Sequence, residues 1–145
     1  MIALRRFVVL AALATITSCT NDNPPACVGS ASATCSPLYT PPTFDNVYNM
    51  TIQNSCGSQR VSCHAAGGAS GLSMADEATA YANLIGRDYV EPGNAACSDM
   101  IVRITSVGAA YQMPQGPATS ALSPAEQCSL IQWVAAGAPG PGSAL

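Results

Sequence analysis

Three residues near the middle of the chain, Cys56, Cys63 and His64, have the types and the order needed to hold a haem group. In covalent haem attachment two thiols add to the vinyl groups of the porphyrin, and the imidazole that follows the second cysteine becomes an axial ligand of the iron. The usual motif has two residues between the cysteines, whereas residues 57–62 intervene here. The spacing leaves two outcomes open: covalent haem, or a Cys56–Cys63 disulfide that closes a short loop.

His64 is the only histidine of the chain, and a lone histidine is usually not a ligand, so both a ligating and a non-ligating role stay open for it. Met113 lies in a loop where Pro114 restricts the backbone, and from there it can reach the haem face opposite His64. Methionine also fills gaps in apolar cores, and this role stays open for Met113. A zinc site is disfavoured, since four ligands would need a distant cysteine beside Cys56, Cys63 and His64. No Ser/His/acid or paired-carboxylate arrangement is visible, so we expect no enzyme activity.

The N-terminus predicts export and lipid anchoring. Residues 1–18 read as a signal peptide: an arginine pair precedes an apolar run, residues 7–16, that is too short to span a bilayer. Cys19 follows a branched apolar residue and two small ones, which resembles the bacterial lipobox; a plain cleaved signal with an incidental cysteine is the alternative. The arginine pair alone is a weak indication of twin-arginine export. Thr20 after Cys19 favours the outer membrane by resemblance to lipoprotein sorting, so we expect a lipid-anchored protein of the cell envelope.

The net charge of the chain argues against two kinds of binding. From Cys19 onward there are three arginines, no lysine and eight acidic residues, a net charge of −5. This balance, without any basic run, argues against binding to nucleic acid and against docking of a basic patch onto anionic lipid.

The remaining cysteines predict disulfides, since an even number stays after Cys19 in an oxidising compartment. Residues 19–42 are rich in Pro, Ser and Ala and read as a tether, in which Cys27 and Cys35 are expected to close a small local loop. Cys97 and Cys128 are expected to join the two C-terminal helices and to contribute roughly 3–4 kcal/mol of stability.

Residues 43–138 predict one all-α domain of about four short helices with long loops. A first helix follows Thr43 and ends before Ser55, a second covers residues 75–84, and a third follows Asn94. Ser123 begins the last helix with a capping box and a proline at the first position. No alternating strand pattern appears, and residues 139–145 are expected to be a disordered tail.

The order of these motifs resembles the cytochrome-c-like domains of bacterial envelope lipoproteins, especially the Cys-rich versions of myxobacteria. The motifs are Cys56, Cys63-His64, Gly71-Leu72, Tyr81-Ala82-Asn83-Leu84, Pro92-Gly93, Met113-Pro114 and Trp133-Val134. The resemblance implies a cytochrome c fold, haem c attached to Cys56 and Cys63, His64 as proximal ligand and Met113 as distal ligand. It also implies that Trp133 packs across the N-terminal helix.

Two hypotheses of different classes follow. In the first, the protein is a c-type-cytochrome-like electron-transfer lipoprotein whose partner is another redox protein, met in a transient contact. In the second, it is a haem-free, disulfide-stapled structural or interaction lipoprotein with a cytochrome-like fold. The second hypothesis pairs Cys27 with Cys35, Cys56 with Cys63, and Cys97 with Cys128, so the state of Cys56 distinguishes the two.

Overall fold

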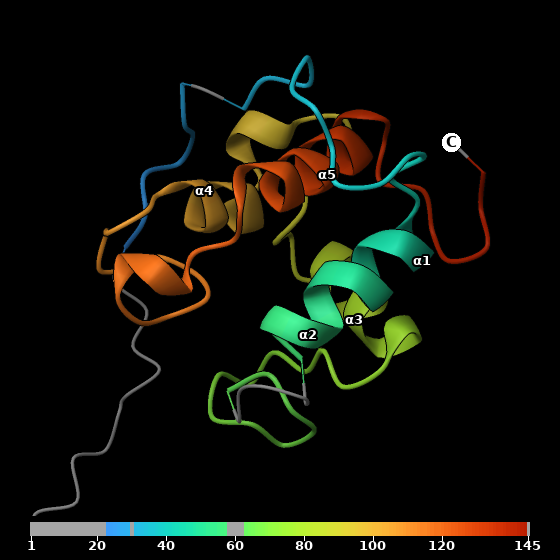
Figure 1. Cartoon of the computed structure of the whole chain (residues 1–145). Helices are drawn as coiled ribbons and strands as arrows, with labels where there is room; N and C mark the ends of the chain where they lie inside the picture. The colour runs from blue at the N-terminus through green and yellow to red at the C-terminus, as the bar shows by residue number, and fades with distance from the viewer. Residues whose placement is uncertain (1–22, 30, 58–62, 145) are drawn as a thin grey trace, which may run out of the picture.

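The computed structural model describes residues 23–29, 31–57 and 63–144. Within these ranges the regular structure is entirely helical, as predicted, and long loops join the helices (Figure 1). The elements are α1 (Phe44–Val47), a π-helical turn (Tyr48–Ile52), α2 (Gln53–Ser55), α3 (Glu77–Gly86), α4 (Asp99–Thr105) and α5 (Pro124–Ala135), with 3-10 turns at Ala95–Cys97 and Ala118–Ser120.

The N-terminal helix is continuous from α1 through the π-helical turn to α2 (Figure 1). Thr43 caps it, as predicted, because its hydroxyl accepts a hydrogen bond from the amide of Asn46. The apolar side chains at helical spacing, including Phe44 and Ile52, are buried against the rest of the domain. A π-helical turn is rare and often marks a functional region of a helix. Here it immediately precedes the segment that leads to Cys56.

Two helices begin later than the sequence pattern predicts. The N-cap of α3 is Asp76, whose carboxylate accepts from the amide of Thr79, and the helix continues to Gly86. The N-cap of α4 is Ser98 and not Asn94, because Ala95–Cys97 forms a separate 3-10 turn. Asn94 instead bonds to the carboxylate of Glu91. The polar residue at a helix start thus indicated the right region but not the right residue.

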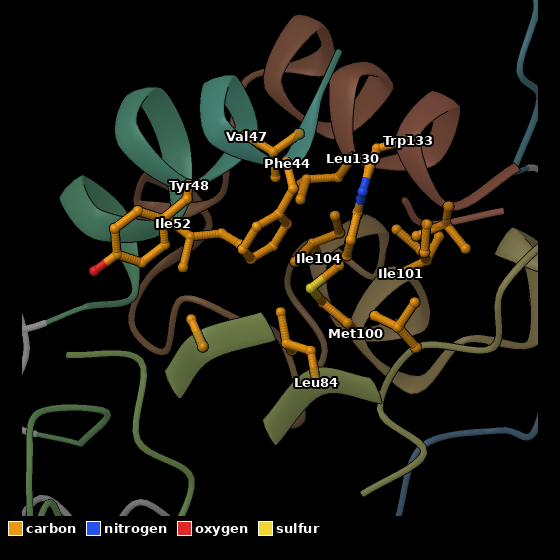
Figure 2. Close-up of a cluster of buried hydrophobic side chains, with 14 of the residues drawn as sticks. Phe44, Val47, Tyr48, Ile52, Leu84, Met100, Ile101, Ile104, Leu130 and Trp133 are labelled. Carbon is orange, nitrogen blue, oxygen red and sulfur yellow. The ribbon is translucent and has the colours of Figure 1, made fainter. Parts of the chain in front are cut away.

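α5 matches its predicted start. Ser123 and Glu126 form the capping box, with Pro124 in the first turn. The indole of Trp133 then lies 5.0 Å from the ring of Phe44, measured between ring centroids, and both side chains are fully buried (Figure 2). Tyr81 packs edge-on against Phe44 at 5.1 Å. This aromatic cluster joins the first and last helices of the domain.

The described part of residues 23–42, which we call the strap, is bonded to the helical body by two disulfides. Cys27 pairs with Cys97 and Cys35 pairs with Cys128. These four cysteines form disulfides as predicted, but the predicted pairs Cys27–Cys35 and Cys97–Cys128 are wrong. The reason is the path of the strap: the amide of Val28 bonds to the carbonyl of Ala96, so each strap cysteine lies beside a distant part of the chain.

The predicted disordered tail is wrong for residues 139–144. The indole Nε1–H of Trp133 donates to the carbonyl of Pro139, and the amide of Gly142 donates to the carboxylate of Asp45. Tyr81 donates its hydroxyl proton to the carbonyl of Ala138. These bonds hold the C-terminal segment against α1 and α3.

None of the helices in the described ranges is long and apolar enough to cross a bilayer. The predicted signal peptide and the lipidation of Cys19 fall outside the described residues and stay predictions.

Candidate cofactor cavity

An apolar cavity lies between the N-terminal helix, residues 63–74, α4, the loop around Met113 and α5. About 80 Å³ inside it is accessible to a water-sized molecule, and the cavity is partly open to solvent. All four predicted haem-binding residues line it: Cys56, Cys63, His64 and Met113. The apolar part of the wall includes Ile52, Leu72, Met74, Met100, Ile104 and Leu130. Figure 2 shows Met100 and Ile104 of α4 together with Ile52 and Leu130.

The imidazole of His64 is buried and its proton is positioned by the backbone. Its Nδ1 lies 2.9 Å from the carbonyl oxygen of Leu72 and 3.0 Å from the hydroxyl of Ser70. A carbonyl oxygen only accepts hydrogen bonds, so Nδ1 carries a proton, and in the neutral imidazole the lone pair is then on Nε2. Metal-bound histidines use this arrangement, in which one nitrogen donates to a carbonyl and the other is left as the ligand.

The loop that carries His64 is held by a small hydrogen-bond network. The hydroxyl of Ser70 donates to the carbonyl of Cys63 and accepts from the amide of Leu72. The amide of Met74 donates to the carbonyl of His64 at 2.7 Å. Residues 63–74 contain no helix, so these bonds fix the backbone on both sides of the imidazole.

Met113 is held by the side chain that precedes it. Gln112 is 2% exposed. Its carboxamide oxygen accepts from the amide of Gly108 at 2.6 Å, and its nitrogen donates to the carbonyl of Pro114 at 3.0 Å. The amide of Met113 donates to the carbonyl of Arg103. The loop is therefore braced on both sides of the methionine, which packs against the core. Met74 and Met100 also line the cavity.

Cys56 carries a free thiol. Burial raises its pKa to about 12, and the negative charge of Glu126 acts in the same direction. Gly57 allows this placement, because a Cβ there would lie 3.0 Å from the carbonyl oxygen of Met74. Because Cys56 is free, the predicted Cys56–Cys63 disulfide of the haem-free hypothesis is wrong. Cys63 itself is disulfide-bonded, and residues 58–62 fall outside the described ranges.

The donor set fits one kind of metal group. Within the described ranges no cluster of three or more His, Cys, Asp or Glu side chains is placed to hold a bare ion. The cavity offers one imidazole and thioether sulfurs inside an apolar wall. These donors suit an iron that brings its own four equatorial nitrogens, as haem does, and needs only axial ligands from the protein.

Three residues of the site were not predicted from sequence: Ser70, Gln112 and Arg103. Ser70 and Gln112 position the loops of His64 and Met113, and Arg103 lines the cavity from α4 beside Asp99. A glutamine directly before Met113 in a Gly- and Pro-rich loop is a signal that could have been noticed. The roles of the other two depend on tertiary contacts.

Comparison with known proteins adds no relative. No protein-family model, no curated protein and no solved structure matches the chain.

Proposed function

We propose that the protein binds one haem in this cavity and acts as a cytochrome-c-like electron carrier of the cell envelope. One observation carries the proposal: His64 lines an apolar cavity with Nδ1 bonded to the carbonyl of Leu72, and Met113 lines the same cavity. A haem held by these residues would supply an iron that exchanges one electron. The sequence order from Cys56 to Trp133 supports the same class.

The protein's own groups do three things in this function. His64 keeps its proton on Nδ1 and offers Nε2, and Met113 offers its sulfur from a loop that Gln112 braces. Thioether sulfur favours the reduced iron and so raises the potential. The apolar wall excludes water and disfavours the additional positive charge of the oxidised state, which acts in the same direction.

Covalent attachment starts from different states at the two cysteines. Cys56 is a free thiol and would hold a haem by addition of its S–H across a vinyl C=C bond, with the sulfur on one carbon, the hydrogen on the other, and no net oxidation. Cys63 is disulfide-bonded, so attachment there would first need an external dithiol, which would be oxidised to its disulfide while Cys63 and the sulfur bonded to it are both reduced to thiols. We therefore expect a thioether at Cys56, and a second one at Cys63 where a reducing dithiol acts during maturation.

The sequence supplies the rest of the proposal. The protein is exported, anchored through lipid at Cys19, placed at the outer membrane, and meets another redox protein transiently. The excess of acidic over basic residues favours a partner with a basic contact surface.

The test is expression of the full chain in a host with haem-attachment machinery, beside a control cytochrome. The expected result is a sharp α-band after reduction and a haem that remains with the polypeptide through acid-acetone extraction. His64→Ala should lose the six-coordinate spectrum. Met113→Leu should lose the sulfur-to-iron band of the oxidised protein, whereas Met74→Leu and Met100→Leu should keep it. A colourless protein beside a coloured control would refute the proposal and leave the haem-free lipoprotein.

A further inference from the structure

A positive group in the cavity wall has a hydrogen-bond donor without an acceptor. Arg103 lies on α4, and its side chain is 11% exposed. Its Nε donates to Asp99 at 2.8 Å. Its Nη1 is buried, and in the part of the chain that the structure describes it has no hydrogen-bond partner. Both residues line the cavity.

Buried polar groups in folded proteins almost always find a partner, so an orphaned guanidinium nitrogen needs an explanation. Among the described residues, the other buried side-chain atom without a partner is the Oε1 of Glu77, an acceptor whose residue does not line the cavity. Other polar groups of the wall are already bonded: Ser70 to His64, and Asp99 to Arg103. The vacant donor thus belongs to a residue of the cavity wall, and an acceptor on the occupant of the cavity would complete its hydrogen bonding.

We propose that Nη1 of Arg103 binds a carboxylate of the cavity's ligand, which under the proposed function, on which this inference rests, is one haem propionate. A carboxylate inside an apolar cavity is unfavourable unless it is paired, and a guanidinium is the side chain best suited to pair with it. Arg103 can serve Asp99 through Nε and the ligand through Nη1 because its donors are fixed in a planar fork.

The same residue also touches the loop of the distal ligand, since its carbonyl accepts from the amide of Met113 at 3.2 Å. Arg103 is thus a positioning residue that connects the ligand's carboxylate, Asp99 and Met113. Its charge has a second effect. A positive charge beside the haem disfavours the oxidised iron, which carries one more positive charge than the reduced iron. Removal of that charge should lower the midpoint potential.

The pH dependence of the potential gives a readout that a purely structural role would not change. A propionate paired with Arg103 stays ionised, so the potential should be nearly constant between about pH 5 and 8. Without the arginine the propionate's pKa rises into this interval, and the potential should fall as pH increases, because the ionised carboxylate favours oxidised iron. Among the described residues, the other titratable or charged side chains that line the cavity are Cys56, His64, Tyr89 and Asp99.

The experiment compares matured holoproteins: wild type, Arg103→Gln, Arg103→Lys and the charge-matched control Arg87→Gln. Arg87 is exposed and donates to the carbonyl of Gly71. R103Q should lower the potential and introduce the pH dependence, while R87Q should follow wild type. R103K keeps the positive charge but loses the planar guanidinium, so it should show the pH dependence with a smaller fall in potential. If R103Q does not mature, R103K decides whether Arg103 binds the carboxylate.

Two results would overturn the inference and can be distinguished. If wild type is coloured and the Arg103 variants match R87Q in potential and pH profile, Arg103 does not bind the carboxylate, and the proposed function stands. If wild type holds no haem beside a coloured control, the proposed function fails and the propionate contact fails with it.

Discussion

Two regions of the molecule are held together by different chemistry. On one side the strap is fixed to the body by the disulfides Cys27–Cys97 and Cys35–Cys128. On the cavity side, hydrogen bonds from Ser70 and Gln112 position the loops that carry His64 and Met113. A disulfide acts mainly by restricting the unfolded chain, whereas a hydrogen bond positions particular atoms. The strap should therefore govern stability and the cavity loops should govern ligation.

The largest expected effect is on the strap side. Replacing both Cys35 and Cys128 by Ser opens a loop with a sequence separation of 93 and should lower the free energy of unfolding by about 4–5 kcal/mol. Urea unfolding followed by circular dichroism measures this change. The matched double replacement of Cys27 and Cys97, with a separation of 70, should cost almost as much. Under the proposed function, the haem spectrum of protein that remains folded should be unchanged in both variants. A loss below about 1 kcal/mol would show that the strap contributes little.

The next prediction compares the replacement of a glutamine in the cavity loop with the replacement of a glutamine beside the strap. Gln112→Ala leaves the amide of Gly108 and the carbonyl of Pro114 without the bonds that Gln112 gives them, which should cost about 2 kcal/mol. In the holoprotein it should also weaken the sulfur-to-iron band, because the loop of Met113 loosens.

Gln132 provides the strap-side control. It donates to the carbonyls of Ala33 and Cys35, and those strap residues are also held by the disulfide Cys35–Cys128. Gln132→Ala should leave the sulfur-to-iron band intact. Equal spectral changes in the two variants would contradict the division between stability and ligation.

A smaller effect is expected at the proximal loop. Ser70→Ala removes the hydroxyl that contacts His64 and bridges Cys63 to Leu72, at a cost of about 1 kcal/mol. The bond from His64 to the carbonyl of Leu72 remains, so haem should still bind, but with a broader distribution of imidazole orientations in the magnetic resonance spectrum of the oxidised protein. Ser73→Ala is the nearby control, since its hydroxyl accepts from the amide of Ala75 and makes no other hydrogen bond among the residues that the structure describes. If S73A broadens that spectrum as much as S70A, Ser70 has no particular role.

The parts of this fold that could be predicted from sequence depend on local interactions. The capping box of Ser123 and Glu126 lies within one turn, so its residues identify the start of α5 directly. Likewise, the apolar spacing from Phe44 to Ile52 predicts the buried face of the first helix. His64 and Met113 were singled out by their types and motif order, and they do line one cavity.

The parts that could not be predicted depend on contacts between distant residues. Six cysteines allow 15 pairings, and nothing near Cys27 indicates that the strap crosses the turn containing Cys97. The tail was expected to be disordered from its composition, but the indole of Trp133 reaches the carbonyl of Pro139. In the sequence, Arg103 looks like an ordinary helix residue paired with Asp99 at i,i+4. Its unpartnered Nη1 indicates a role in ligand binding only once the adjacent cavity is known.

The smallest effect is expected for Ser129→Ala. It is matched to Ser70→Ala, because each change removes one serine hydroxyl, the first beside the strap and the second in the cavity loop. Ser129 is fully buried in α5, and its hydroxyl accepts from the amide of Leu38 in the strap. That amide also donates to the carbonyl of Ala125, and the adjacent disulfide Cys35–Cys128 holds the strap in place. Ser129→Ala should therefore cost only about 0.5 kcal/mol by urea unfolding, with no change in the haem spectrum. A loss greater than that of S70A would mean that hydrogen bonds, and not only disulfides, hold the strap.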